Sequence, residues 1–83
     1  MEVKTTLRYL RKTVVELQST HTVAEGCTAG ALAGRIIEEH QAQAGINFTG
    51  ASIAVLVNGR LAAEDWLLHD GDVMQILPVA AGG

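Results

Sequence analysis

The segment TAGALAGRIIEEHQAQAG, residues 28–45, sets the class of fold because it is the one long stretch with clear helical spacing. Five of its side chains recur at that spacing and share one face: Leu32, Ala33, Ile36, Ile37 and His40. Thr28 belongs to the residue types preferred as N-caps, and Gly45 can adopt the left-handed conformation that ends a helix. The sequence therefore predicts one helix, which begins after Thr28 and ends at about Ala44.

Segments on both sides of this helix have the patterns of β-strands. Residues 2–10 alternate between two sides, as a half-buried strand does. Residues 52–58 form a continuous apolar run, which favours a central strand. After a turn at Asp70-Gly71, residues 72–77 give the last strand, and we expect Pro78 to close it because proline has no N–H for a ladder hydrogen bond.

The shorter elements are less regular. Residues 13–17 either prolong the first strand or form a turn, and residues 21–24 are predicted as a short second strand. Asn58-Gly59 is the strongest two-residue hairpin signal, so the chain is expected to reverse there into residues 60–62. Residues 63–68 are typical of a helical turn or a packed loop.

This order of elements predicts an α+β domain, in which a mixed sheet of four to five strands packs on one main helix. That is the β-grasp arrangement. With 83 residues and 48% apolar composition, the chain fits one domain, residues 1–78, followed by a flexible tail, residues 79–83. Gly30 and Gly34 weaken the helix, which suggests that each allows close approach to the sheet.

Composition also excludes several classes of partner. The net charge is −3 and the basic residues form no cluster, so no nucleic-acid footprint is present. No apolar run approaches the roughly 20 residues that span a bilayer, and no secretory leader precedes the first strand, so we expect no membrane partner and a cytoplasmic location. The one cysteine cannot form an internal disulfide.

The candidate functional segment is the tail after Pro78, which carries almost no side chain to bury. Gly82 and Gly83 make it slim enough, when extended, to enter a narrow channel. A carboxylate is a poor electrophile until it is activated, and adenylation supplies a leaving group on an acyl carbon that glycine leaves uncovered. Two terminal glycines are equally typical of a frayed, inert end.

The sequence resembles the MoaD/ThiS sulfur-carrier proteins, which are ubiquitin-like. The segments that carry the resemblance are Val57-Asn58-Gly59-Arg60, Leu68, Asp70-Gly71-Asp72-Val73, Ile76-Leu77-Pro78-Val79, Gly82-Gly83, and Ala24 to Thr28 continuing to His40. The resemblance implies a carrier with no catalytic residues and no bound cofactor. A MoeB/ThiF-like partner would adenylate Gly83 with ATP, after which Gly83 would become a thiocarboxylate, while the partner's channel holds Pro78, Val79, Ala80, Ala81 and Gly82.

The resemblance is compatible with two biosynthetic pathways. Leu77-Pro78 looks like the small subunit of molybdopterin synthase, whereas Glu64-Asp65-Trp66 is similar to the thiamine-pathway carriers. Molybdopterin biosynthesis is favoured, with a MoaE-like enzyme as sulfur acceptor and a ThiG-like one as the other choice. The alternative function is a ubiquitin-like modifier that is conjugated through Gly83 to lysines, and a third reading is an interaction module with an inert tail.

Cysteine and histidine residues give no further chemistry. Cys27 precedes the helix, where a thiol could act as a sulfur relay, but without a second Cys or a paired His nearby a small packed hydrophobe is favoured. The histidines, His21, His40 and His69, are too scattered for metal-ligand spacing. We therefore predict no metal site.

Four carboxylates form two neighbouring pairs: Asp70 with Asp72, and Glu38 with Glu39. The first pair flanks a turn glycine and the second faces solvent on the helix, so structural roles are expected for both. Trp66 is expected to pack over the edge of the small core. Arg60 is expected to be a solvated turn residue.

Overall fold

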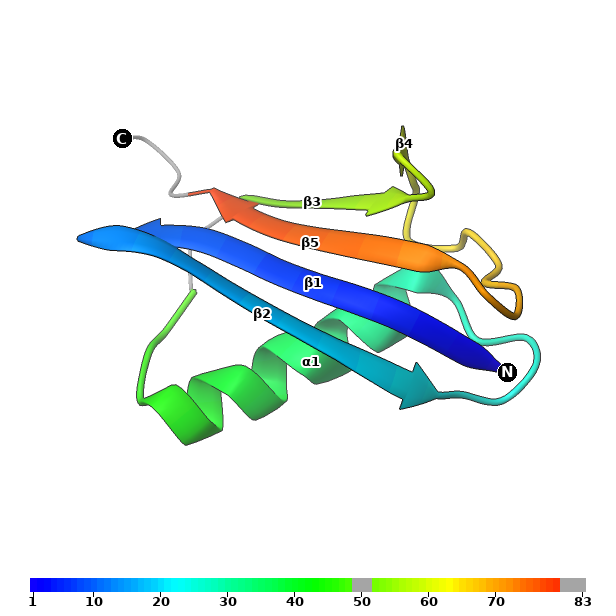
Figure 1. Ribbon diagram of the computed structural model, residues 1–83, viewed down its shortest axis with the longest axis horizontal. Helices are drawn as coiled ribbons and strands as arrows, with labels where there is room; N and C mark the ends of the chain where they lie inside the picture. The colour runs from blue at the N-terminus through cyan, green and yellow to red at the C-terminus, as the bar shows by residue number, and fades with distance from the viewer. Residues whose placement is uncertain (49–51, 80–83) are drawn as a thin grey trace.

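The computed structural model describes residues 1–48 and 52–79, which form one helix and one mixed sheet (Figure 1). The elements in chain order are β1 (Glu2–Arg11), β2 (Thr13–Thr22), α1 (Ala29–Ala44), β3 (Ser52–Val57), β4 (Arg60–Leu61) and β5 (Val73–Val79). The strand order is β2-β1-β5-β3-β4, and β1 and β5 run parallel while the other neighbours are antiparallel. The predicted α+β class and β-grasp arrangement are confirmed.

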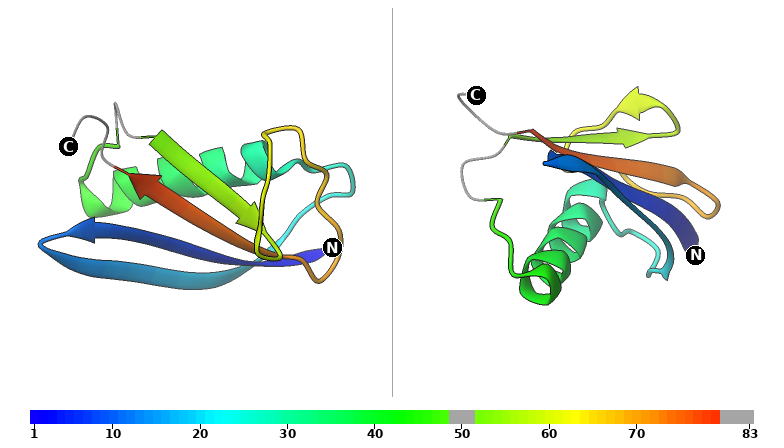
Figure 2. Two further views of the ribbon diagram at one scale, coloured as in Figure 1. Left: turned by 90° about the horizontal axis from the view of Figure 1, so that it is seen from above. Right: turned by 60° about the vertical axis from the view of Figure 1, so that its left-hand side comes forward.

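The core lies between α1 and the one face of the sheet that the helix covers (Figure 2). Alternate residues of the strands point to this face, and the largest fully buried side chains are Leu32, Met74, Ile76, Val3 and Val57. The predicted helical face supplies Leu32, Ala33, Ile36 and Ile37 to the same cluster. Burial of these apolar side chains is the main stabilising contribution to the domain.

Local capping fixes both ends of α1 as the sequence predicts. The Thr28 side chain accepts a hydrogen bond from the Ala31 N–H at 3.2 Å, which satisfies one of the free donors of the first turn. Gly45 has φ 66° and its N–H donates to the Gln41 carbonyl, so the helix ends in the left-handed conformation. The predicted helix is therefore confirmed at both ends.

The second strand is longer than predicted. Residues 13–17 belong to β2 itself, which begins at Thr13 and ends at Thr22, so the short strand expected at residues 21–24 is wrong. Lys12, with φ 56°, makes the turn, and β2 then pairs antiparallel with the whole of β1. Most side chains of β2 are exposed, so pairing with β1 rather than an apolar alternation maintains the strand.

The prediction that residues 52–58 form the central strand is also wrong, because β5 lies in the middle and β3 is one position from the edge. Nor does Pro78 close β5, which continues to Val79. The Asn58 N–H bonds to the Val73 carbonyl, so alternation along β5 turns Pro78 toward β1. Pairing with β1 ends at Ile76, and the N–H that proline lacks is therefore not needed.

Positive-φ residues form the predicted turns. Asn58 (φ 52°) and Gly59 (φ 80°) make the hairpin between β3 and β4, and Gly71 (φ 84°) makes the turn before β5. Residues 63–68 form a loop that joins the start of α1 through a bridge between Leu67 and Thr28. The hairpin at Asn58-Gly59 and the packed loop at residues 63–68 agree with the predictions for these segments.

Only one of the two helix glycines makes a close approach. A Cβ atom on Gly30 would lie 2.8 Å from the Glu64 carbonyl oxygen, which accepts the Gly30 N–H at 2.9 Å. The neighbour is thus a loop and not the sheet. Gly34 has nothing within 4 Å of its Cβ position, so the expectation of a close approach there is wrong.

Candidate functional site

The predicted tail begins inside the sheet. Pro78 is buried and pairs with Ile53, and Val79 pairs with Ser52 while 58% of its surface stays exposed. Both residues are therefore paired with β3, so Val79, the first residue of the predicted tail, belongs to the sheet. Ala80, Ala81, Gly82 and Gly83 lie outside the described residues.

An apolar surface lies on the β5, β3 and β4 part of the sheet face that α1 leaves open, and we call this part the open face. Its apolar side chains are Ala54, Leu56, Leu61, Val73, Leu77 and Val79. They share this face because their neighbours in the same strands, Met74, Ile76 and Val57, point into the core. Leu61 and Val73 keep 73% and 43% of their surface exposed. We treat this grouping as a candidate interaction surface.

Sequence reasoning missed the open face, although β5 contains the signal for it. Residues 73–79 are apolar at both alternating sets of positions, with Gln75 the one polar residue. One helix covers only one face of a sheet, so a strand that is apolar on both faces must leave apolar side chains in contact with solvent. β5 thus contributes side chains both to the core and to the open face, and its last residue, Val79, lies on the open face.

A hydrogen-bonded network holds the start of β5 in place. The buried Asp72 carboxylate accepts from the Asn58 side-chain amide at 2.9 Å and from the His69 N–H at 2.7 Å. The Asn58 side chain in turn accepts from the Val73 N–H at 3.0 Å. Asp70 accepts from the Glu2 N–H at 2.7 Å. The structural roles predicted for Asp70 and Asp72 are confirmed.

The other residues weighed in the sequence contribute no joint site. Glu38 and Glu39 are exposed on α1, Cys27 is partly buried against the core as expected, and Arg60 is exposed beside the hairpin. Trp66 keeps 38% of its surface exposed, so the expectation that it packs over the core is wrong; its N–H and carbonyl groups, not its ring, tie the loop to Ala63 and Ala29.

The three histidines make separate contacts and form no common site. His40 contacts the Tyr9 hydroxyl at 2.8 Å, His21 contacts the Ser19 hydroxyl at 2.8 Å, and His69 lies next to Asp72. Residues 1–48 and 52–79 contain no group of three His, Cys, Asp or Glu side chains arranged to hold a metal ion. No helix in the described part of the chain is long and apolar enough to span a bilayer.

Comparison with solved structures defines the class of protein. The fold is similar to SAMP1 from Haloferax volcanii, with a TM-score of 0.60, 19% identity, and coverage of 96% of this chain and 99% of that one. It is also similar to the protein described as molybdopterin converting factor, subunit 1, from Pyrococcus furiosus (0.57, 23%, 94% and 99%). A ubiquitin from Caldiarchaeum subterraneum gives 0.55, 17%, and full coverage of both chains. The domain is therefore a ubiquitin-like β-grasp domain.

The family follows from the sequence itself. The model of the ThiS family matches residues 6–83, which includes β5 and the whole tail through Gly83. The chain therefore belongs to the ThiS family, and its resemblance to the MoaD/ThiS proteins is confirmed. No curated protein sequence matches it significantly.

Proposed function

We propose that this chain is a sulfur carrier whose Gly83 carboxylate is the reactive group. The observation that carries the proposal is that the family match runs through the last strand and the tail to Gly83. The folded body supports it, because β5 ends at Val79 on an apolar surface on which an activating enzyme can dock. The chain acts as a consumed and regenerated cosubstrate and has no catalytic residue of its own.

The proposed chemistry has two steps. A carboxylate oxygen of Gly83 attacks the α-phosphorus of ATP on a MoeB/ThiF-like enzyme, which forms the acyl adenylate and releases pyrophosphate. A sulfur nucleophile supplied by a sulfur donor then attacks the acyl carbon, and AMP leaves with the bonding electron pair. When the donor is a persulfide, the product is an acyl disulfide. A thiol then attacks the donor sulfur, forms a disulfide with it, and leaves the other sulfur as a thiocarboxylate on Gly83.

The slim tail has a physical role in this scheme. Residues 79–83 are Val, Ala, Ala, Gly and Gly, which leave a small cross-section at the reacting end. A channel that encloses such a tail excludes water from the acyl adenylate and so protects it from hydrolysis. In this proposal Pro78 and Val79 mark where the sheet ends and the channel begins, and Ala80, Ala81 and Gly82 fill it.

We place the carrier in cofactor biosynthesis, with molybdopterin favoured over thiamine as the product that receives the sulfur. The acceptor is then a MoaE-like enzyme, with which the carrier forms a synthase as the small subunit. A ThiG-like acceptor is the corresponding partner in the thiamine pathway. The Leu77-Pro78 sequence at the end of β5 supports the first choice, and Glu64-Asp65-Trp66 supports the second.

Intact mass spectrometry of the protein from its native cells tests the proposal. We expect a population in which one terminal oxygen is replaced by sulfur, and its fraction should fall when the cells are starved of sulfur. Higher-mass conjugates through Gly83 would instead support the ubiquitin-like modifier. An unmodified terminus under sulfur-replete growth would contradict both functions and favour the inert module.

A matched pair of variants tests the channel. Gly82→Val adds a branched side chain to the tail and should abolish adenylation, measured as ATP–pyrophosphate exchange with the activating enzyme. Ala24→Val adds a comparable side chain at an exposed position between β2 and α1 and should leave exchange unchanged. Equal exchange rates for Gly82→Val and the unmodified protein would show that the tail does not enter a narrow channel.

A further inference from the structure

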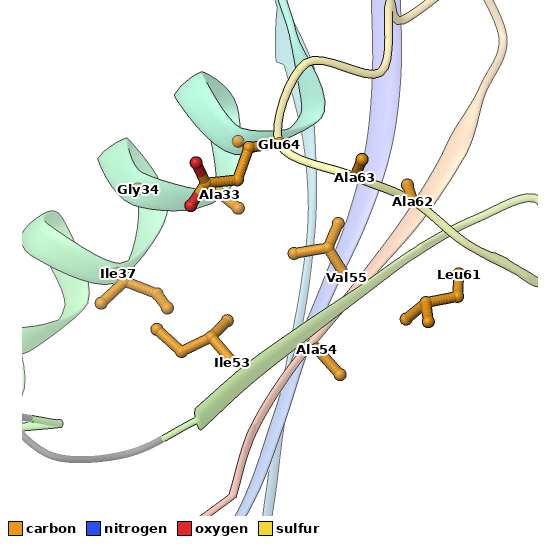
Figure 3. A pocket seen from close by; sticks show the side chains of 11 residues that line it. Ala33, Gly34, Ile37, Ile53, Ala54, Val55, Leu61, Ala62, Ala63 and Glu64 are labelled. Atoms are coloured by element: carbon orange, nitrogen blue, oxygen red, sulfur yellow. The ribbon is translucent and has the colours of Figure 1, made fainter.

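A groove of about 310 Å³ lies between α1 and the edge of the sheet, where β3 is followed by β4 and its loop (Figure 3). Its walls are mostly apolar, and the side chains facing it include Ala33, Ile37, Ile53, Val55 and Ala62. Figure 3 shows Ile53 beside Ile37 at one end, and Val55 toward Ala63 and Glu64 at the other. The groove lies on the helix side of β3, because Ile53 and Val55 point toward α1, and it shares Ala54 and Leu61 with the open face.

The strand edge beside this groove is only partly paired. β4 pairs with Leu56 and Val57, and the Ala62 N–H adds one bond to the Val55 carbonyl at 2.8 Å. Because Asn58 bonds to β5, alternation turns the backbone groups of Ile53 and Val55 away from β5 and toward the outer edge. Within residues 1–48 and 52–79 no bond reaches the Val55 N–H or the N–H and C=O of Ile53.

Gly34 keeps the groove wide without any benefit inside the described chain. A glycine in a helix interior costs about 1 kcal/mol relative to alanine. Gly30 has a structural reason for that cost, because the Glu64 carbonyl lies against it, whereas the Cβ position of Gly34 has no neighbour within 4 Å. The space beside Gly34 is part of the groove and can receive a side chain from another molecule.

The charge at the rim points to the character of that molecule. The Glu64 side chain is exposed at the end of the groove beyond Val55, and Asp65 follows it. Among the described residues no Lys or Arg nitrogen lies within 4.0 Å of either carboxylate. A cationic side chain bound there would find two uncompensated negative charges, in a chain whose net charge is −3.

We propose that this edge binds an extended peptide segment of a partner protein, which adds as a strand antiparallel to β3. The segment bonds to Ile53 and the Val55 N–H, puts alternate apolar side chains into the groove, and carries a Lys or Arg near its N-terminal end beside Glu64. The antiparallel direction follows from β4, which itself runs antiparallel to β3. After Ala62 the chain leaves this edge and turns toward Gly30, and the peptide continues along the edge in the direction of β4. The proposal is independent of the chemistry of Gly83.

A synthetic peptide, acetyl-Lys-Thr-Val-Thr-Val-Thr-Ile-amide, serves as the probe with the full-length chain. Fluorescence anisotropy of a labelled form should give saturable binding with a Kd below about 1 mM. Amide exchange followed by NMR should slow at Ile53 and Val55 on saturation, which identifies strand addition. The same peptide with Glu in place of Lys should bind at least about fivefold more weakly. Absence of saturable binding, or of slowed exchange at both amides, would overturn the proposal.

Two helix variants separate the groove from general effects on α1. Gly34→Leu fills the groove and should weaken binding by about tenfold or more, while it raises helix propensity. Ala42→Leu adds the same side chain at an exposed position of α1 that does not line the groove, and should leave the Kd within about twofold. Equal affinities of the two variants would overturn the proposal, and circular dichroism shows that both are folded.

Two other occupants give distinct results. If a second copy fills the groove, the free protein sediments as a dimer that Gly34→Leu converts to a monomer. If residues 80–83 fill it, exchange at Ile53 and Val55 is already slow in the free chain and becomes fast when these residues are deleted. Either result would overturn the assignment to a partner peptide. Gly82→Val should not alter peptide binding, so failure here and failure of sulfur transfer remain distinguishable.

Discussion

The two faces of the sheet contain similar apolar side chains in opposite surroundings. Along β5, Met74 and Ile76 have no exposed surface under α1, whereas Val73 and Val79 on the other face keep 43% and 58% of theirs. A buried aliphatic side chain contributes directly to the free energy of unfolding, and an exposed one contributes little. The covered face therefore determines stability, and the open face contributes little to it.

The largest effect on stability is expected from the covered face. Ile76→Ala should lower the free energy of unfolding by about 3 kcal/mol, because it removes buried methyl groups and leaves a cavity. Val79→Thr, on the open face of the same strand, keeps the shape of the side chain and should change stability by less than about 0.5 kcal/mol. Urea titrations of the two variants check the difference, and similar midpoints would contradict it.

The two helix glycines compare a Cβ position that is blocked by a neighbour with one that is free. Gly30→Ala should destabilise the domain by about 2 kcal/mol, because the added Cβ would lie 2.8 Å from the Glu64 carbonyl oxygen. Gly34→Ala meets no neighbour and should stabilise it by up to about 1 kcal/mol. Thermal unfolding followed by circular dichroism measures both, and a loss of stability in Gly34→Ala would show an unrecognised contact.

Asp72 tests the network that holds the start of β5. Asp72→Ala should cost about 1.5 kcal/mol, because the His69 N–H and the Asn58 amide lose their acceptor in a buried position. Asp70→Ala removes an exposed acceptor of the Glu2 N–H and should cost about half as much. Urea titration of each variant gives the ranking, and an equal cost would mean that burial of Asp72 is unimportant.

The smallest effect on stability should accompany a large effect on activation. Val73→Thr combined with Val79→Thr reduces the apolar character of the open face and should change stability by less than about 1 kcal/mol. If the activating enzyme docks there, kcat/KM for adenylation should fall about tenfold. Leu67→Thr, at an exposed loop residue, is the control and should leave kcat/KM unchanged. Unchanged activation in the double variant would exclude the open face as the docking surface.

The elements that the sequence predicted well are those set by local interactions. Thr28 and Gly45 act within a turn of the helix ends, and Asn58-Gly59 adopts the positive φ angles that its hairpin requires. The full length of β2 was not predicted, because its side chains are mostly exposed and the strand is maintained by backbone pairing with β1, which its own sequence pattern does not indicate. Gly30 and Gly34 look alike in sequence, and only the distant loop at Glu64 distinguishes them.

For the candidate site, too, local sequence features could be used, whereas features that depend on the order of the strands could not. The slim tail stays a prediction from composition: the family match includes it, and residues 80–83 lie outside the described residues. The sequence of β5 indicates apolar side chains on both faces of that strand, but the other residues of the open face and those of the groove could not be predicted, because the order of the strands in the sheet is not local. The central position of β5 depends on pairing with both β1 and β3, which are far from it in the sequence.

The parallel pairing of β1 with β5 has a kinetic consequence. Lys4 to Leu7 pair with Val73 to Ile76, so the sheet joins the first and the last strand of the described chain. Pairing between such remote segments is slow to form, and until β5 emerges from the ribosome the hairpin of β1 and β2 has only α1 to pack against. Folding of this domain is therefore expected after translation of β5 and not during it, because a nascent chain without β5 lacks the middle strand of the sheet.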